Sequence, residues 1–220
     1  MEQIINKMAA AGHRLGGLSE LYESGGRGPG TVSGGQGDPG GVSYGLYQLA
    51  SRTGTAAAFV KTEGSRWAAE LAGEPGSPCF SAAWKAIALR EGEAFATAQH
   101  AFIQRTHYVP AVRAVRAATR YDLDCRGPAL RDAVWSTAVQ HGSAARLLIA
   151  AVADADKLAP RGTVEHDRAC IEAIYRRRTA HVMAIAAKSG PAVRRTLTNV
   201  AQRRYPAELS AALEMLARLG

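Results

Sequence analysis

The sequence predicts a mainly α-helical fold with one small β-element in its N-terminal part. Apolar residues recur at helical spacing through most of the chain, whereas residues 42–46 alternate apolar with small side chains, as a short strand does. Ten of the 23 glycines lie between Gly25 and Gly45, which predicts a tightly folded loop around that strand. With 47% apolar residues, the 220-residue chain is globular and long enough for one domain over residues 1–220, with room for two lobes.

The N-terminal half is expected to hold a helix, the β-element and two further helices. Apolar residues at helical spacing (Leu15, Leu18, Leu21, Tyr22) lead to Glu23, and Gly25 and Gly26 end that helix. The elements expected after it are a β-hairpin between about Thr31 and Leu49, a helix from Thr55 to about Glu63, a loop over Gly73–Ser81 and a helix capped by Ser81 that runs to about Arg90.

The C-terminal half is expected to be mainly helical, with a connection over Tyr121–Pro128. A helical pattern runs from Glu93 to Thr119 and is broken near Pro110, because proline lacks the backbone donor that a helix interior needs. Further helices are expected over 129–141, over 164–187, from Pro191 and from Pro206, with five inward residues in the long one: Ile171, Ile174, Tyr175, Val182 and Ile185. The three tryptophans are assigned to the core: Trp67, Trp84 and Trp135.

The three cysteines indicate neither a disulfide framework nor a zinc site, because their number is odd and their spacing is wide. Cys79, Cys125 and Cys170 are therefore interpreted as buried small apolar residues. The sequence has no phosphate-binding loop, no serine nucleophile elbow and no zinc-protease motif. We expect no cofactor and no metal.

The chain is strongly basic, with a net charge of +8 and a pI of about 9.8. The charge gathers in four clusters: Arg113–Arg120, Arg176–Arg178, Arg194–Arg195 and Arg203–Arg204. Such charge predicts a polyanionic partner, either nucleic acid or the anionic bacterial envelope, unless it is only a solvated surface. The sequence contains no helix-turn-helix, zinc finger or aromatic RNA-binding motif, so nucleic acid is disfavoured.

No apolar run approaches the length that crosses a bilayer, so no transmembrane segment is expected. The N-terminus carries Glu2, Asn6 and Lys7 among its apolar residues and makes a poor signal peptide. The protein is therefore expected to be made in the bacterial cytoplasm, and any action outside it requires another exit route.

Two carboxylates near the glycine-rich segment have the setting that a glycosidase needs. Glu23 follows apolar residues at a helix end, where partial burial would raise its pKa and keep it protonated as a general acid. Asp38 lies in a Gly-Asp-Pro-Gly-Gly turn and could hold the attacking water in an inverting mechanism. A solvated Glu23, a turn-capping Asp38 and the neighbouring Glu20 as the true acid are the alternatives.

The pattern Glu23-Ser24-Gly25, followed by Ser43-Tyr44-Gly45-Leu46-Tyr47-Gln48, resembles the lysozyme-like superfamily. Lytic transglycosylases share the Glu-Ser pair and a related glycine-to-glutamine segment. The Gly-Asp setting is more similar to family 46 chitosanases, as are the helix that ends in His141-Gly142 and the arginine-bearing stretch 175–178. The Glu-to-Asp spacing is shorter than in chitosanases, and a basic protein does not suit polycationic chitosan.

The resemblance implies a lysozyme-like α+β fold with a small β-ribbon at a catalytic cleft. It implies that Glu23 and Asp38 are catalytic and that five further residues bind substrate: Ser43, Tyr44, Tyr47, Gln48 and His141. For His141 the alternative is a buried, hydrogen-bonded histidine at a helix end. Ser43 and Tyr44 either contact an acetamido sugar or position the carboxylates.

The predicted function is hydrolysis of β-1,4 bonds between N-acetylmuramic acid and N-acetylglucosamine in peptidoglycan. Similar sequences are peptidoglycan-cleaving domains of phages and of type VI secretion spike-associated proteins. The resemblance therefore implies a monomer that a holin, a virion or a secretion partner delivers to the periplasm or cell wall. A lytic transglycosylase that uses Glu23 alone and a non-catalytic wall-binding module are the alternatives.

Overall fold

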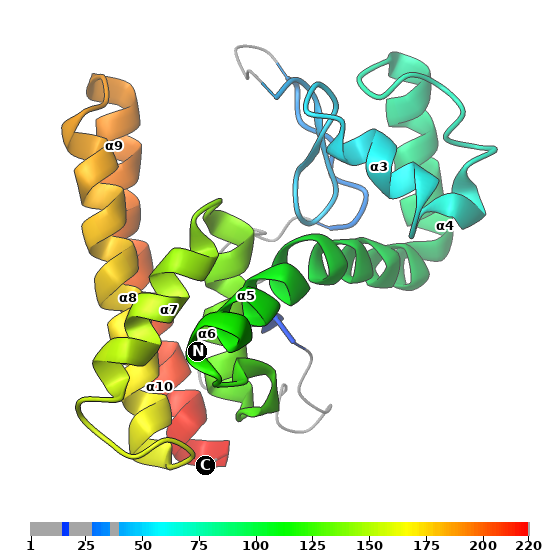
Figure 1. The fold of residues 1–220 in the computed structure, drawn as a ribbon. Helices are drawn as coiled ribbons and strands as arrows, with labels where there is room; N and C mark the ends of the chain where they lie inside the picture. Colours follow the sequence, from blue (N-terminus) through cyan, green and yellow to red (C-terminus); the bar gives the residue numbers. More distant parts are fainter. Residues whose placement is uncertain (1–14, 18–27, 36–39, 220) are drawn as a thin grey trace. The chain divides into compact units, whose positions relative to one another are not determined.

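The computed structural model describes residues 15–17, 28–35 and 40–219. These residues form two compact units (Figure 1). The ribbon unit comprises the described residues up to Thr106, except 15–17, and the helical unit comprises 15–17 and the chain from His107 onward. The predicted fold class is confirmed: helices predominate and the described residues contain one two-stranded sheet. The helix expected to end at Glu23 lies largely outside the described residues.

The ribbon unit contains the sheet and two main helices. Strands β1 (Ser43–Tyr44) and β2 (Leu49–Ala50) pair antiparallel, in the register Ser43↔Ala50 and Tyr44↔Leu49. The hairpin expected between Thr31 and Leu49 is therefore confirmed. The helical segments that follow are α3 (Thr55–Lys61), the 3₁₀ turn η1 (Ser65–Trp67) and α4 (Pro78–Ile103).

Helix α4 begins earlier than the sequence predicted, and a kink at Glu91 marks the interruption expected between Arg90 and Glu93. Its N-cap is Ser77, whose Oγ accepts a hydrogen bond from the Phe80 amide at 3.2 Å, so the expected cap at Ser81 is wrong. Pro78 fits the first turn because that position needs no amide donor. The helix continues past Arg90 to Ile103, and only Glu91 departs from helical geometry, at φ −134° and ψ 39°.

An aromatic cluster forms the core of the ribbon unit. Trp84 is fully buried on α4, and its ring centroid lies 4.6 Å from that of Phe95 and 5.4 Å from that of Phe59. Trp67 packs edge-on against Phe95 at 4.9 Å. The core assignment of Trp67 and Trp84 is thus confirmed, and the cluster gives the short strands a rigid base.

The helical unit starts within a π-helical turn, η2 (Gln104–Tyr108). Its later elements are α5 (Val109–Thr119), η3 (Leu123–Cys125), α6 (Pro128–Gln140), α7 (Ala144–Ala155), α8 (Val164–Ala187), α9 (Pro191–Asn199), the π-helical η4 (Val200–Arg204) and α10 (Tyr205–Leu219). Helix α8 packs on α6, α7 and α10, and the buried Trp135 lies on α6. Helix α7 was not among the helices predicted from the sequence.

Three burial predictions are wrong. Cys79 and Cys125 are exposed, and only Cys170 is buried, although all three are free thiols. Ile185 was expected to point inward on α8, but it is 42% exposed. It lies near the end of α8, so part of the predicted apolar stripe faces solvent there.

Candidate active site

The two predicted catalytic carboxylates, Glu23 and Asp38, lie outside the described residues. The chain shortly before Glu23 is held by α6, because the Gly16 amide donates to the buried Asp132 Oδ1 at 2.8 Å. The chain on both sides of Asp38 belongs to the ribbon unit. The described chain therefore ends at Gly17 before Glu23, and at Gly35 and Gly40 on the two sides of Asp38.

Backbone pairing holds the segments on either side of residues 36–39. Val32 forms a bridge with Tyr44, and the Gly45 amide donates to the Thr31 carbonyl at 2.7 Å. On the other side, the Arg52 amide donates to the Gly40 carbonyl at 3.0 Å. Both ends of the segment that carries Asp38 are consequently tied to the β1–β2 ribbon.

Tyr44 anchors the ribbon to the aromatic core. Its side chain is fully buried, with ring centroids 5.0 Å from Phe80 and 5.1 Å from Trp84. Its hydroxyl lies 2.9 Å from Ser81 Oγ and accepts a hydrogen bond from the Gly76 amide at 2.8 Å. These contacts give Tyr44 a packing role in the ribbon. Its predicted contact with a substrate stays a prediction.

The adjacent Ser43 is also mostly buried, at 6% exposure. Its backbone amide donates to Ser33 Oγ at 2.8 Å, and its carbonyl accepts from the Ser33 amide at 2.9 Å. Ser43 thus joins the strand to the segment that leads toward Asp38. This placement suits the predicted alternative in which Ser43 positions a carboxylate, and that role stays a prediction.

A buried side-chain amide on α4 joins the turn between the two strands to the segment that precedes Thr31. Gln99 is fully buried; its Oε1 accepts from the Leu46 amide at 3.0 Å and its Nε2 donates to the Pro29 carbonyl at 3.1 Å. The Trp84 indole donates to the same carbonyl at 2.8 Å. Gly45 lies directly against this amide at φ +72°, and a Cβ there would come within 2.1 Å of Gln99 Oε1. Sequence reasoning missed Gln99.

Tyr47 and Gln48 lie in the tight turn between the two strands. Gln48 has a left-handed backbone, with φ 53°, and its Nε2 donates to the Gly45 carbonyl at 3.0 Å. Such a conformation is uncommon for a non-glycine residue and recurs at ligand-contacting positions. The Tyr47 ring lies 6.4 Å from His100. Both side chains are half-buried, and their predicted role in substrate binding stays a prediction.

His141 belongs to the helical unit and caps the C-terminal end of α6. It is 8% exposed, and its Nε2 lies 3.0 Å from the Tyr205 hydroxyl. Burial, followed by the positive charges of Arg178, His181 and Arg204, lowers its pKa to about 3. It is therefore neutral at physiological pH. The structure describes the buried, hydrogen-bonded histidine of the predicted alternative, and contact with a substrate stays a prediction.

A buried ion pair lies next to His141. Arg178 on α8 is fully buried and donates to Glu208 of α10 at 3.2 Å and to Ser136 of α6 at 3.0 Å. Its guanidinium also stacks over Tyr205, with 4.4 Å to the ring centroid. A buried charge is tolerated only when its partners satisfy it, so this pair joins α6, α8 and α10 into one framework.

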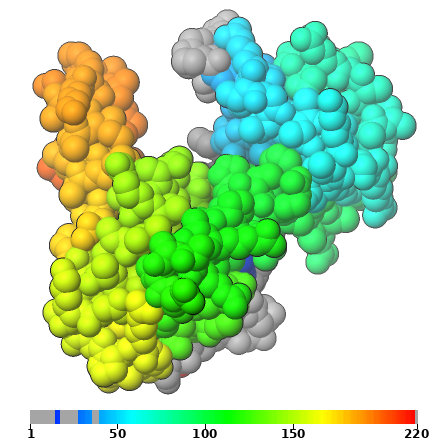
Figure 2. All heavy atoms as spheres, viewed as in Figure 1, coloured from blue at the N-terminus to red at the C-terminus, as the bar shows by residue number. Residues whose placement is uncertain are grey.

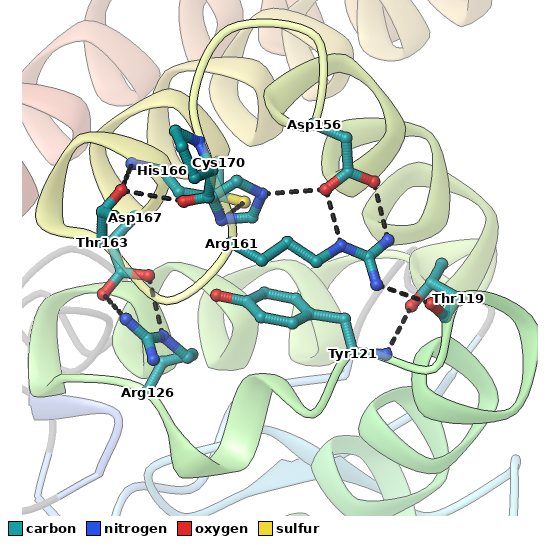
Figure 3. Close-up of polar contacts among 10 residues, drawn as sticks. Thr119, Tyr121, Arg126, Asp156, Arg161, Thr163, His166, Asp167 and Cys170 are labelled. Carbon is teal, nitrogen blue, oxygen red and sulfur yellow. Dashed lines mark hydrogen bonds and ion pairs between the residues drawn. The ribbon is translucent and has the colours of Figure 1, made fainter.

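A second polar cluster joins the loop between α7 and α8 to the helices around it (Figure 3). Asp156 forms a two-point contact with Arg161, with both N–O distances 2.7 Å, and its Oδ1 lies 3.0 Å from His166 Nε2. The opposite ring nitrogen of His166 lies 3.6 Å from Cys170 Sγ. The order Cys-His-Asp is that of a thiol nucleophile with its base.

The chemistry of this cluster does not support a nucleophile. Cys170 is fully buried, and burial raises the pKa of its thiol to about 12, whereas a reactive cysteine needs a lowered pKa and access. Thr163 Oγ1 accepts from the His166 amide at 3.1 Å and so caps α8. Arg126 pairs with the nearby Asp167 at 2.9 Å. The cluster is therefore structural and closes the loop onto the helix.

The described residues contain no group of three or more histidines, cysteines or acids that could hold a metal ion. Within the same residues no helix is both long enough and apolar enough to span a membrane. The β1–β2 ribbon gathers four of the substrate-binding residues predicted from the sequence: Ser43, Tyr44, Tyr47 and Gln48.

Comparison with known proteins shows which family this chain is similar to. The family model for the C-terminal part of type VI secretion system spike proteins similar to VgrG3 matches residues 15–204. The chain is also 38% identical, over 139 residues, to the type VI secretion system spike protein VgrG3 of Vibrio cholerae. That match covers 63% of this chain and 13% of the relative, so the chain spans a small part of that protein's length.

Proposed function

Because the chain belongs to the VgrG3-like C-terminal family of type VI secretion spike proteins, we propose that it degrades peptidoglycan as a muramidase. It hydrolyses the β-1,4 bond between N-acetylmuramic acid and N-acetylglucosamine. Glu23 protonates the glycosidic oxygen, and Asp38 takes a proton from the attacking water. This division of labour needs two carboxylates on opposite sides of the sugar ring.

The anchored ribbon is the observation that carries this proposal. The segment bearing Asp38 begins and ends on a two-stranded ribbon that Tyr44 and Gln99 fasten to an aromatic core. A general base works only when its distance to the water is held. Backbone hydrogen bonds at Thr31 and Gly40 hold the described chain on either side of the segment that carries Asp38, which supports this role. The left-handed Gln48 at the end of the same ribbon is a suitable amide for a sugar hydroxyl or acetamido group.

The family also supports a route to the substrate. The similar Vibrio cholerae protein is a secretion spike, and the 139 matched residues cover 13% of it. We propose that the present domain travels with a type VI spike from the cytoplasm of one bacterium to the periplasm of another.

The test is analysis of the fragments released from purified sacculi. The unaltered protein should release muropeptides with reducing N-acetylmuramic acid ends. Glu23→Gln should abolish release, because an amide cannot donate the proton, with a rate loss of about 10²–10⁴-fold. Glu20→Gln is the matched control, and it should retain activity. A dead Glu20→Gln protein together with an active Glu23→Gln protein would reassign the acid.

Mass spectrometry separates hydrolysis from its closest rival. A lytic transglycosylase would give anhydro-muramic ends, which lack one water relative to the hydrolysis product, and would not need Asp38. A non-catalytic wall-binding module would sediment with sacculi and release nothing. Anhydro ends or an absence of fragments would therefore refute the muramidase proposal.

A further inference from the structure

The net positive charge of the chain belongs entirely to one of its two units. Residues 23–106 contain seven Lys or Arg and seven Asp or Glu, so the remaining residues, which include the helical unit, account for the whole net charge of +8. Between Glu172 and Glu208 the chain has eight Arg or Lys and no acidic residue. This stretch covers the later turns of α8, all of α9 and η4.

Five of these eight cations already have structural partners. Arg176 and Arg177 pair with Asp154 at 2.9 and 2.8 Å, while Arg178 and Arg204 pair with Glu208. Arg194 donates to the Ala186 and Ser189 carbonyls at 3.2 and 3.1 Å, and so caps the end of α8. Their charges are used within the fold.

Three cations of the stretch remain without an ion pair among the described residues. They are Lys188 at the end of α8, Arg195 on α9 and Arg203 on η4, and all three are exposed. We call these three residues the cationic hairpin. Like charges on one small element repel one another and lower its stability, and no acidic neighbour relieves them here. Their placement is therefore better explained by an external anion than by folding.

Packing does not explain the composition of this element. Helix α9 has no buried residue, and its contacts run to α8 and η4. In Figure 1, α9 lies beside the last turns of α8, beyond the end of α7, and in Figure 2 the same segment forms the orange projection of the helical unit. An exposed helix of this kind offers its polar face to a ligand rather than to a core.

The polar character of the exposed face selects the kind of anion. An amphipathic helix that binds a lipid surface needs a broad apolar face beside its cations. On α9 the exposed residues between Pro191 and Thr196 include one large apolar side chain, Val193, beside two arginines. Spaced cations on a polar helix instead suit separate carboxylates on a flexible polymer, which they bind by exposed ion pairs.

We propose that the cationic hairpin captures the acidic peptide stems of peptidoglycan. This inference rests on the proposed function, which makes peptidoglycan the substrate, and it adds which part of the polymer this surface binds. Stem peptides carry free carboxylates at regular intervals along the glycan, whereas the sugar backbone itself contributes few charges. The hairpin thus raises the local concentration of substrate without taking part in bond cleavage.

The test compares two triple variants with equal loss of charge. K188Q/R195Q/R203Q removes the cationic hairpin, and R113Q/R146Q/K157Q removes three exposed and unpaired cations elsewhere on the same unit. Binding is measured by co-sedimentation with intact sacculi and with sacculi whose stem carboxylates have been converted to neutral amides by carbodiimide coupling to ammonia. Each variant is made in the Glu23→Gln background so that binding is observed without cleavage.

The hairpin variant should bind intact sacculi about tenfold more weakly, the product of three exposed ion pairs worth roughly twofold each. The control variant should change less than about twofold, and the difference between the two variants should vanish on the amidated sacculi. In the active background, KM for sacculi should rise and kcat should stay unchanged. Equal losses in the two variants, or a difference that persists on the amidated sacculi, would overturn the proposal.

Failure of the proposed function has a different signature. If the unaltered protein bound sacculi through the hairpin but released no fragments, the muramidase proposal would fail and stem capture would stand. If the hairpin variant instead lost binding to vesicles of anionic phospholipid while its binding to sacculi stayed normal, a membrane surface would be the partner and stem capture would be refuted.

Discussion

Replacing Gln99 by Met should loosen the ribbon while keeping the shape of the core. Met fills nearly the same volume but removes both hydrogen bonds of the amide. The Pro29 carbonyl keeps the hydrogen bond that it accepts from the Trp84 indole at 2.8 Å. Losing the Gln99 Nε2 donor should therefore change the free energy of unfolding little. The Leu46 amide loses the bond that it donates at 3.0 Å, and no other acceptor for it is described. An orphaned donor of this kind costs about 1–3 kcal/mol.

A loss of about 2 kcal/mol should lower the thermal midpoint by roughly 4–8 °C for a chain of this size. Differential scanning fluorimetry measures that shift, and Gln202→Met, an exposed glutamine on η4, is the control that should leave it unchanged. At a temperature where both variants are folded, Gln99→Met should also release fragments from sacculi more slowly. A midpoint within about 1 °C of the unaltered protein would refute this role of Gln99.

Gly45 supplies a second check on the same contact. Gly45→Ala places a Cβ 2.1 Å from Gln99 Oε1 and demands a left-handed φ of +72°, so it should be more destabilising than Gln99→Met. Combining Gly45→Ala with Gln99→Ala removes the colliding atoms. The double variant should then be about 1–2 kcal/mol more stable than the sum of the two single effects. Strict additivity would show that the two residues do not touch.

Three further outcomes are expected. Asp38→Asn should lose most hydrolysis without losing stability, and azide should partly restore turnover with the opposite anomer; near-normal turnover with anhydro products would contradict its role as base. Raising ionic strength from low to moderate should slow lysis of sacculi severalfold while the thermal midpoint barely moves, because exposed charges are screened over about 8 Å at physiological salt; a flat salt profile would exclude electrostatic capture. Folding lowers the pKa of His141 from 6.5 to about 3. Between these two pH values the histidine is protonated in the unfolded chain and neutral in the folded one. The contribution of His141 to the free energy of unfolding should therefore be fully present above pH 6.5 and should decrease as the pH falls toward 3. In urea unfolding measurements, His141→Asn should show a smaller decrease over this pH range. An identical pH dependence in the variant would rule out His141 as its source.

Local chemistry explains which elements the sequence predicted well. The predicted bounds of α8, 164–187, match the structure because Thr163 caps its first turn and Gly190-Pro191 follows its end. The start of α4 was misplaced because Ser77 and Ser81 are both able to cap. Pro78 identifies the right one, since proline favours the first helical position. Cap chemistry of this kind acts within four residues and can be found from sequence.

The ribbon was predictable, but its support was not recognised. Residues 43–48 carry the resemblance to lysozyme-like enzymes, whereas the amide that holds them is more than fifty positions away on α4. A signal for Gln99 existed. It lies one turn after Phe95 and one turn before Phe102, and a polar residue between two apolar residues of the same helix face is expected to be buried and paired. The helical periodicity of the sequence predicts that Gln99 is buried, whereas its hydrogen-bond partners become known only from the fold.

The buried ion pair shows how far such reasoning extends. Arg176, Arg177 and Arg178 are equivalent in composition, but Arg178 alone shares the helix face of Tyr175 and Val182, and it alone is fully buried. A cation on an apolar stripe requires an anion on another one, because removing either partner of a buried pair costs about 3–5 kcal/mol. Within the last helix, Glu208 stands on the apolar stripe that starts at Tyr205. Pairing Arg178 with Glu208 predicts that α8 packs on α10, as the structure shows. A charged residue within an apolar stripe therefore carries information about tertiary contacts.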